Sequence, residues 1–84
     1  MATGTVILID EARSRFLLRL HQASIFSVFS LRSDVGIAIG DEVRGNLSAM
    51  GPQKIRHVRQ ELTIRVFGET GPCTEEQGVR RMAT

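Results

Sequence analysis

The chain has 84 residues, of which 42% are apolar and 24% are charged, which is the balance of one small globular domain. No apolar run approaches the roughly 18–20 residues of a membrane-spanning helix, and the apolar start lacks the basic region of a secretory signal. The formal net charge is only +2, and the single cysteine, Cys73, excludes an internal disulfide. We therefore expect a cytoplasmic protein that does not enter a membrane.

The positive charges come from ten Arg and a single Lys, Lys54, and this excess of arginine has two explanations. The planar guanidinium suits contacts with phosphate and stacks on nucleobases, which indicates a nucleic-acid partner. A GC-rich coding sequence also replaces Lys by Arg, without any functional meaning.

Two strands are predicted in the first third of the chain. Thr5–Ile9 is apolar at consecutive positions, as expected of a strand that is buried on both faces or shared by two sheets. After the polar break Asp10–Ser14, alternate residues of Phe16–Leu20 share one face of a second strand. A helix over Glu11–Ala23 is the alternative on propensity, but the segment is short and lies between two β-like runs, which favours the strand.

The middle of the chain predicts two further strands and a corner between them. Ser24–Arg32 is rich in β-branched and aromatic residues and has no helix start signal. The polar connection Ser33–Gly36 follows, and an alternating apolar run then reaches Gly40-Asp41. Gly supplies permissive backbone for a turn and Asp bonds its own backbone there, so the fourth strand is predicted as Glu42–Leu47.

The last third predicts one long strand and a tail. Ser48–Gln53 is predicted as a loop because it contains a Gly-Pro pair. Lys54–Phe67 is predicted as a fifth strand, with a bend or bulge near Arg59–Glu61 because its length is unusual for a single strand. The rest of the chain, residues 68–84, is polar and aperiodic, so we expect a flexible, disordered tail.

Short strands separated by turn signals at intervals of roughly ten residues indicate a small barrel. The fold class is therefore predicted to be all-β, a five-stranded OB-fold-like barrel over residues 1–67, with an SH3-like barrel as the alternative. A long, coiled first strand, as in the OB-fold, explains the two apolar faces of Thr5–Ile9.

Several short motifs follow one another between Gly4 and Val58. They are the Gly-Thr-Val opening at Gly4–Val6, the turn Asp10-Glu11, the run Ile25–Ser30, the corner Gly40–Val43, and Gly51–Gln53 followed by Val58. This order resembles the cold-shock domain, a single OB barrel that binds single-stranded RNA or DNA. The resemblance implies an OB-fold protein that binds nucleic acid.

The resemblance also implies a platform of aromatic side chains on the first three strands, on which bases stack. Three of the family's positions differ here: Leu8 replaces a Trp, Ser14–Leu17 replaces a Gly-Phe-Gly-Phe segment, and Val28 replaces a His. Base stacking on aromatics contributes about 1–3 kcal/mol per base, so these replacements predict weak binding. The aromatic candidates that remain are Phe16, Phe26 and Phe29.

Basic residues supply a second set of candidate nucleic-acid contacts. They are Arg13, Arg15 and Arg19 around the second strand, and Lys54, Arg56, His57 and Arg59 on the fifth. If those two strands are neighbours in the barrel, these side chains form one groove that follows a phosphate backbone, with Arg15 stacking on a base. The alternative is that outward strand positions must be polar and that Arg is this chain's usual choice. Carboxylates near such a groove would also repel phosphate (Asp10, Glu11, Asp41, Glu42).

The predicted function is weak, salt-dependent binding of single-stranded RNA or DNA through this arginine-rich face. A protein-interaction or homodimerisation module without nucleic-acid binding is the alternative, because apolar strand faces and a free edge after Leu62–Phe67 would accept a partner. No enzyme, cofactor or metal is expected. His21 and His57 lack the spacing of a metal site, one cysteine cannot complete such a site, and Cys73 has no neighbouring base.

Overall fold

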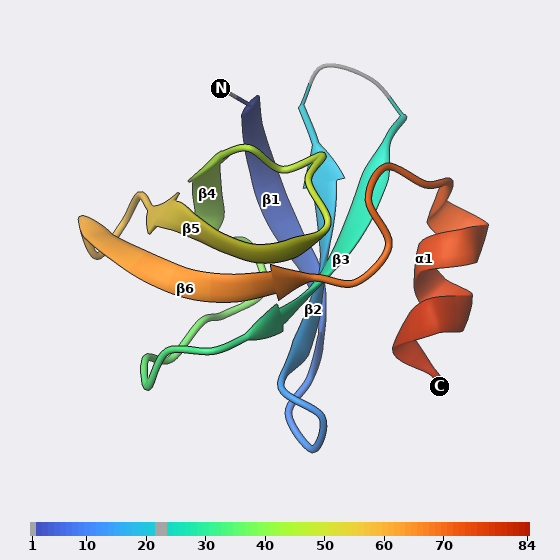
Figure 1. Cartoon of the computed structure of the whole chain (residues 1–84), viewed down its shortest axis with the longest axis horizontal. Helices are drawn as coiled ribbons and strands as arrows, with labels where there is room; N and C mark the ends of the chain where they lie inside the picture. The colour runs from blue at the N-terminus through green and yellow to red at the C-terminus, as the bar shows by residue number, and fades with distance from the viewer. Residues whose placement is uncertain (1, 22–23) are drawn as a thin grey trace.

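Six strands and one short helix make up most of residues 2–21 and 24–84, the part of the chain that the computed structural model describes (Figure 1). Their bounds are β1 Ala2–Asp10, β2 Arg15–Leu20, β3 Phe26–Leu31, β4 Glu42–Gly45, β5 Gly51–His57, β6 Leu62–Gly68 and α1 Glu75–Met82. The predicted all-β barrel is confirmed, but the predicted count of five strands is wrong. Met1, Gln22 and Ala23, which fall in the predicted barrel range 1–67, lie outside the described residues.

The barrel is closed, with strand order β1-β2-β3-β6-β5-β4 and a final pairing of β4 with β1. All of these pairings are antiparallel. The free edge predicted after Leu62–Phe67 is covered along Val66–Gly68, because β6 pairs there with β3. Closure therefore leaves only the first part of β6 without a strand partner on this side, whereas the sequence predicts a free edge along the whole strand.

β1 pairs with strands on both of its sides and contains an irregularity. It pairs with β4 over Ala2–Thr5 and with β2 over Gly4–Asp10, and the register of the pairing with β2 shifts between Val6 and Leu8. Val6 packs in the barrel core, whereas Ile7 packs against a second apolar cluster outside the barrel. The two apolar faces of the predicted strand Thr5–Ile9 are therefore both used, although Leu8 stays exposed.

The barrel interior is filled by apolar residues from all six strands. The rings of Phe16 and Phe29 stack there with their centroids 5.9 Å apart, which adds about 0.5–1.5 kcal/mol to the effect of the area they bury. Phe16, Leu18 and Leu20 all belong to this core, whereas Leu17 belongs to the outer cluster. This alternation confirms the strand predicted over Phe16–Leu20 and excludes its helical alternative.

The predicted fifth strand Lys54–Phe67 is wrong, because this segment contains two strands joined by a turn. β5 and β6 pair over their whole length, and the chain reverses over residues 58–61. Glu61 has a left-handed φ of 55° in this turn, which is uncommon for a residue with a side chain. Gly51–Gln53, predicted as part of a loop, belongs to β5.

The predicted disordered tail is also wrong for residues 75–82, which form α1. Thr74 and Gln77 make a capping box at its start. The Oγ1 of Thr74 accepts from the Gln77 N–H at 3.1 Å, and the side-chain oxygen of Gln77 accepts from the Thr74 N–H at 3.0 Å. Two Glu in the first turn and two Arg in the last turn also complement the helix dipole.

α1 packs on the outside of the barrel beside β3 (Figure 1). Met82 is buried in the outer cluster with Leu17 of β2 and Val28 of β3. Gly78 brings the helix close, since a Cβ at this position would lie 2.6 Å from the Cδ1 of Leu17. The helix therefore covers the outer face of β2 and β3, which makes that face part of the protein interior.

Gly68 offers a test of the packing where the barrel closes. A Cβ at this position would overlap the carbonyl oxygen of Ala49 and lie 3.0 Å from the Cα of Met50, and both are backbone atoms. We expect Gly68→Ala to lower the free energy of unfolding by about 1–3 kcal/mol, the usual cost of overpacking, as measured by urea denaturation. Gly36→Ala is the control, because no atom lies within 4 Å of its Cβ. An equal loss of stability in both variants would contradict this account.

Candidate nucleic-acid interface

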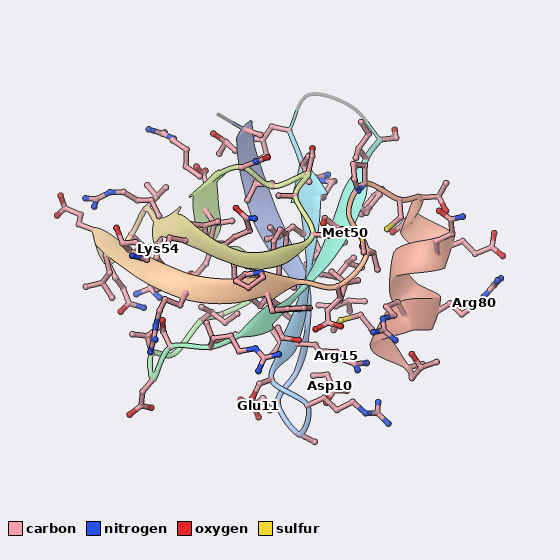
Figure 2. All side chains as sticks on the ribbon, in the orientation of Figure 1. Asp10, Glu11, Arg15, Met50, Lys54 and Arg80 are labelled. Carbon is pink, nitrogen blue, oxygen red and sulfur yellow. The ribbon has the colours of Figure 1, made fainter. Side chains whose placement is uncertain are left out.

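Strand alternation places a group of cations on the outside of β4, β5 and β6. Arg44 of β4 lies directly opposite Arg56 of β5, and Lys54 of β5 lies opposite Arg65 of β6. Arg32, from the connection after β3, lies next to them because its N–H donates to the carbonyl of Arg65 at 2.8 Å. Figure 2 shows Lys54 over the β5–β6 pair. We call this surface the basic face, and its five side chains are all exposed (Arg32, Arg44, Lys54, Arg56 and Arg65).

The basic face brings like charges together, and none of its five side chains forms an ion pair in the part of the chain that the structure describes. Like charges that lie directly opposite each other on neighbouring strands are destabilising. β4 also places one acidic side chain on the outside of the barrel, that of Glu42, two positions before Arg44. The charge of the basic face is therefore balanced mainly from solution, by small ions or by an anionic ligand.

A groove of about 660 Å³ opens at one end of the basic face. The guanidinium of Arg32 lies over the ring of Phe67, with the Arg32 Cζ 5.2 Å from the ring centroid. The volume lies within the range of sites that hold small molecules. The groove is lined by three cationic and four uncharged residues (Arg32, Lys54, Arg65, Gln53, Pro52, Val66 and Phe67).

The aromatic candidates from the sequence do not form a base-stacking platform. Phe16 and Phe29 are fully buried and stack on each other inside the barrel. Phe26 is buried in the outer cluster together with Leu17 and Val28. Leu17 and Val28 are among the positions where the resemblance implies contacts with bases, and α1 covers them. The three Phe are therefore removed from the list of candidate contacts by their burial.

The predicted groove between the second and fifth strands is wrong, because β2 and β5 lie on opposite sides of the barrel. They are separated by β1 and β4 in one direction and by β3 and β6 in the other. Arg13 and Arg15 instead donate to the carbonyls of Met82 and Arg81 at the end of α1, at 3.4 and 3.1 Å. Figure 2 shows Arg15 at this end of the helix. Arg19 is exposed on β2, away from the basic face.

His57 and Arg59, both predicted to contact nucleic acid, bind Asp41 instead. His57 is fully buried: its Nε2 donates to the Asp41 Oδ2 at 2.8 Å, and its Nδ1 accepts from the Gln60 N–H at 3.2 Å. Arg59 donates from Nε and Nη2 to the two oxygens of Asp41, each at 3.2 Å. The Ala38 N–H also donates to Asp41, at 2.9 Å. These contacts join the connection before β4 to the β5–β6 turn.

The contacts of Asp41 also determine its charge. Burial opposes ionisation of the carboxyl group, but hydrogen bonds from Arg59, from the Ala38 N–H and from His57 outweigh burial and lower the pKa of Asp41 from 3.8 to about 2. The carboxylate is therefore ionised at neutral pH and paired with the guanidinium of Arg59. Its negative charge is compensated locally, so the expected repulsion of phosphate by Asp41 is largely cancelled.

Three members of the basic face are absent from the sequence-based candidates: Arg32, Arg44 and Arg65. The signal for Arg65 is present in the sequence, because this residue lies between Ile64 and Val66, which alternation assigns to the core. The same alternation applies to Arg44 in β4. Arg32 has no such signal, since it follows the end of β3 and only the pairing of β3 with β6 brings it to this face.

Comparisons with known proteins do not add a functional assignment. A scan against protein-family models matched no family, and searches of curated proteins and of solved structures gave no match. Within residues 2–21 and 24–84, no group of three or more His, Cys, Asp or Glu side chains is placed to hold a metal ion. No helix in that part of the chain is long and apolar enough to cross a membrane. The basic face thus remains the surface from which a function is inferred.

The lowered pKa of Asp41 predicts a defined acid sensitivity. Because the folded value, about 2, lies below the unfolded value of 3.8, ionised Asp41 stabilises the fold fully above about pH 4, and this contribution is lost as the pH falls toward 2. A shift of this size corresponds to about 2 kcal/mol. Urea denaturation from about pH 6 down to about pH 3 should therefore show a steeper loss of stability in the unaltered protein than in Asp41→Asn.

The acid range also contains a second carboxyl group, so the comparison needs a control. A hydrogen bond from Ser30 lowers the pKa of Glu69, burial opposes this, and Arg81 lowers it further. Glu69 is present in both proteins, so the difference between their pH profiles isolates Asp41. Asp34→Asn, which changes an exposed Asp, should keep the profile of the unaltered protein. Identical profiles for all three proteins would refute a stabilising role of ionised Asp41.

Proposed function

We propose that this protein binds single-stranded RNA or DNA weakly, and in a salt-dependent manner, through the basic face. One observation supports the proposal most directly: Arg44 lies opposite Arg56 and Lys54 lies opposite Arg65, with no acidic partner for any of them among the described residues. Such pairs cost stability in the free protein, and a polyanion removes that cost. The charge needed for binding is therefore already gathered on one surface.

The spacing of these cations suits a phosphate backbone. Neighbouring strands lie roughly 5 Å apart, and residues two positions apart on a strand lie roughly 7 Å apart. Arg44, Arg56 and Lys54 are neighbours in these two directions, so they form a continuous track. Arginine also provides a planar donor group that matches phosphate oxygens. Binding of this kind is driven by counterion release and carries little sequence preference.

The relation to OB-type barrels of the cold-shock kind is part of this proposal. It is supported by the run of three antiparallel neighbours β1-β2-β3 and by the irregular β1, which pairs with both β2 and β4. The extra strand, the antiparallel pairing of β6 with β3 and the covering helix are departures from the predicted five-stranded form. The proposed binding surface accordingly lies on β4, β5 and β6 and not under α1.

The alternative of a protein-interaction or homodimerisation module has less support. The exposed large apolar residues come from separate segments of the chain, and closure shortens the free edge of β6. Sedimentation velocity over a range of concentrations tests the homodimer directly, and monomeric behaviour throughout would exclude that form of the alternative. The residues concerned are Leu8, Ile25, Ile39, Met50, Leu62 and Val79.

Titration of fluorescently labelled single-stranded RNA and DNA at low and moderate salt tests the proposal. We expect dissociation constants of roughly 1–100 µM near physiological salt, with affinity falling as salt rises. The double variant Arg44→Ala, Arg56→Ala should bind more weakly. Its plot of log affinity against log salt should also flatten by about 0.7 for each phosphate that the variant no longer neutralises.

Arg19→Ala is the matched control for this experiment, because it removes one exposed positive charge from the opposite side of the barrel. Its affinity and salt dependence should stay close to those of the unaltered protein. Equal weakening by Arg19→Ala and by Arg56→Ala alone would show that only the net charge matters, and not the basic face. Absence of binding at low salt up to roughly 100 µM protein would refute the proposed function itself.

A further inference from the structure

The groove at the end of the basic face contains kinds of side chain that binding to a phosphate backbone does not require. Contacts with phosphate need only cations and hydrogen-bond donors. The groove also contains the ring of Phe67 and the exposed Pro52. Apolar and aromatic surface next to three cations fits a ligand that is flat and apolar in one part and anionic in another. A nucleotide has this composition.

The walls of the groove are fixed by backbone pairing. The Arg32 N–H donates to the Arg65 carbonyl at 2.8 Å, and the Oγ of Ser33 accepts from the Arg65 N–H at 2.6 Å. These bonds hold the connection after β3 against β6, with Arg32 over the Phe67 ring. On the other side, Pro52 is the cross-strand partner of Phe67. A groove formed in advance loses little conformational entropy when a ligand binds.

We propose that this groove binds one nucleotide of the single strand. This inference rests on the function proposed above. Its base stacks on the Arg32 guanidinium, which lies over the Phe67 ring, and its phosphates contact Lys54 and Arg65. Bases of single strands stack both on aromatic rings and on guanidinium planes. In a duplex the bases are already stacked inside the helix, so only the phosphate contacts remain. The groove therefore makes the protein prefer single strands to duplexes.

Phe67→Leu tests the groove because it keeps an apolar side chain and removes the aromatic ring that supports the Arg32 guanidinium. We expect its affinity for a labelled oligothymidine strand to fall by about ten-fold, the order expected when one base no longer stacks. Its affinity for a duplex of the same length should stay unchanged. Phe67→Tyr should retain the affinity for the single strand, since the aromatic face is preserved. Circular dichroism and thermal unfolding check that each variant is folded.

Two controls connect the effect to the base and to this end of β6. Leu62→Ala removes an exposed apolar side chain from the other end of the same strand and should leave the affinity for oligothymidine unchanged. An abasic strand of equal length keeps the phosphates without the bases. The unaltered protein should bind the abasic strand about as weakly as Phe67→Leu binds oligothymidine.

The outcomes separate this inference from the proposed function. If the strand binds and its affinity depends on Arg44 and Arg56, but a folded Phe67→Leu binds it as tightly as the unaltered protein, only the nucleotide groove is refuted. Equal affinity of the unaltered protein for the abasic and the thymidine strand refutes the groove in the same way. If the unaltered protein binds neither strand nor duplex, both proposals fail together.

Discussion

Closure of the barrel determines which side chains of β5 and β6 face the core and which face solvent. Because β4 pairs with β1 while β6 pairs with β3, the apolar residues of the hairpin must lie inside, and the polar positions between them must lie outside together. Closure also buries the polar ring of His57, whose Nε2 donates a hydrogen bond to the carboxylate of Asp41. Arg59 completes the charge balance of that carboxylate. The core, the contacts of Asp41 with His57 and Arg59, and the basic face thus all follow from closure of the barrel.

α1 gives a physical reason for the departures from the cold-shock pattern. Leu17 and Val28 are apolar because the helix covers them, and Met82 packs against the same cluster. Aromatic or polar groups that bind bases at these two positions would be useless under a helix. The same observation moves the proposed ligand surface to the other half of the barrel, where no helix packs among the described residues.

Local patterns in the sequence were sufficient for the first four strands. Consecutive apolar residues predicted the first, alternation the second (Phe16–Leu20), β-branched and aromatic residues the third, and the Gly40-Asp41 corner the start of the fourth. The β5–β6 turn was predicted only as a bend or bulge near Arg59–Glu61, because residues 58–61 contain no Gly, Pro, Asn or Asp. That turn is held by tertiary contacts of Arg59 with Asp41, which local patterns do not contain. α1 was missed although its signal was present, namely the capping box of Thr74 and Gln77. The position of the basic face depends on strand order, which alternation does not specify.

The pairs Arg44–Arg56 and Lys54–Arg65 have a consequence for the free protein as well. Dissolved ions screen part of the repulsion within each pair, so added salt lowers the cost of these two pairs in the free protein. The same ions compete with a polyanion for the same side chains. Ionic strength therefore acts with opposite sign on the cost of these pairs and on the proposed binding of a polyanion. Small ions at the basic face thus lower the repulsion among its side chains in the free protein.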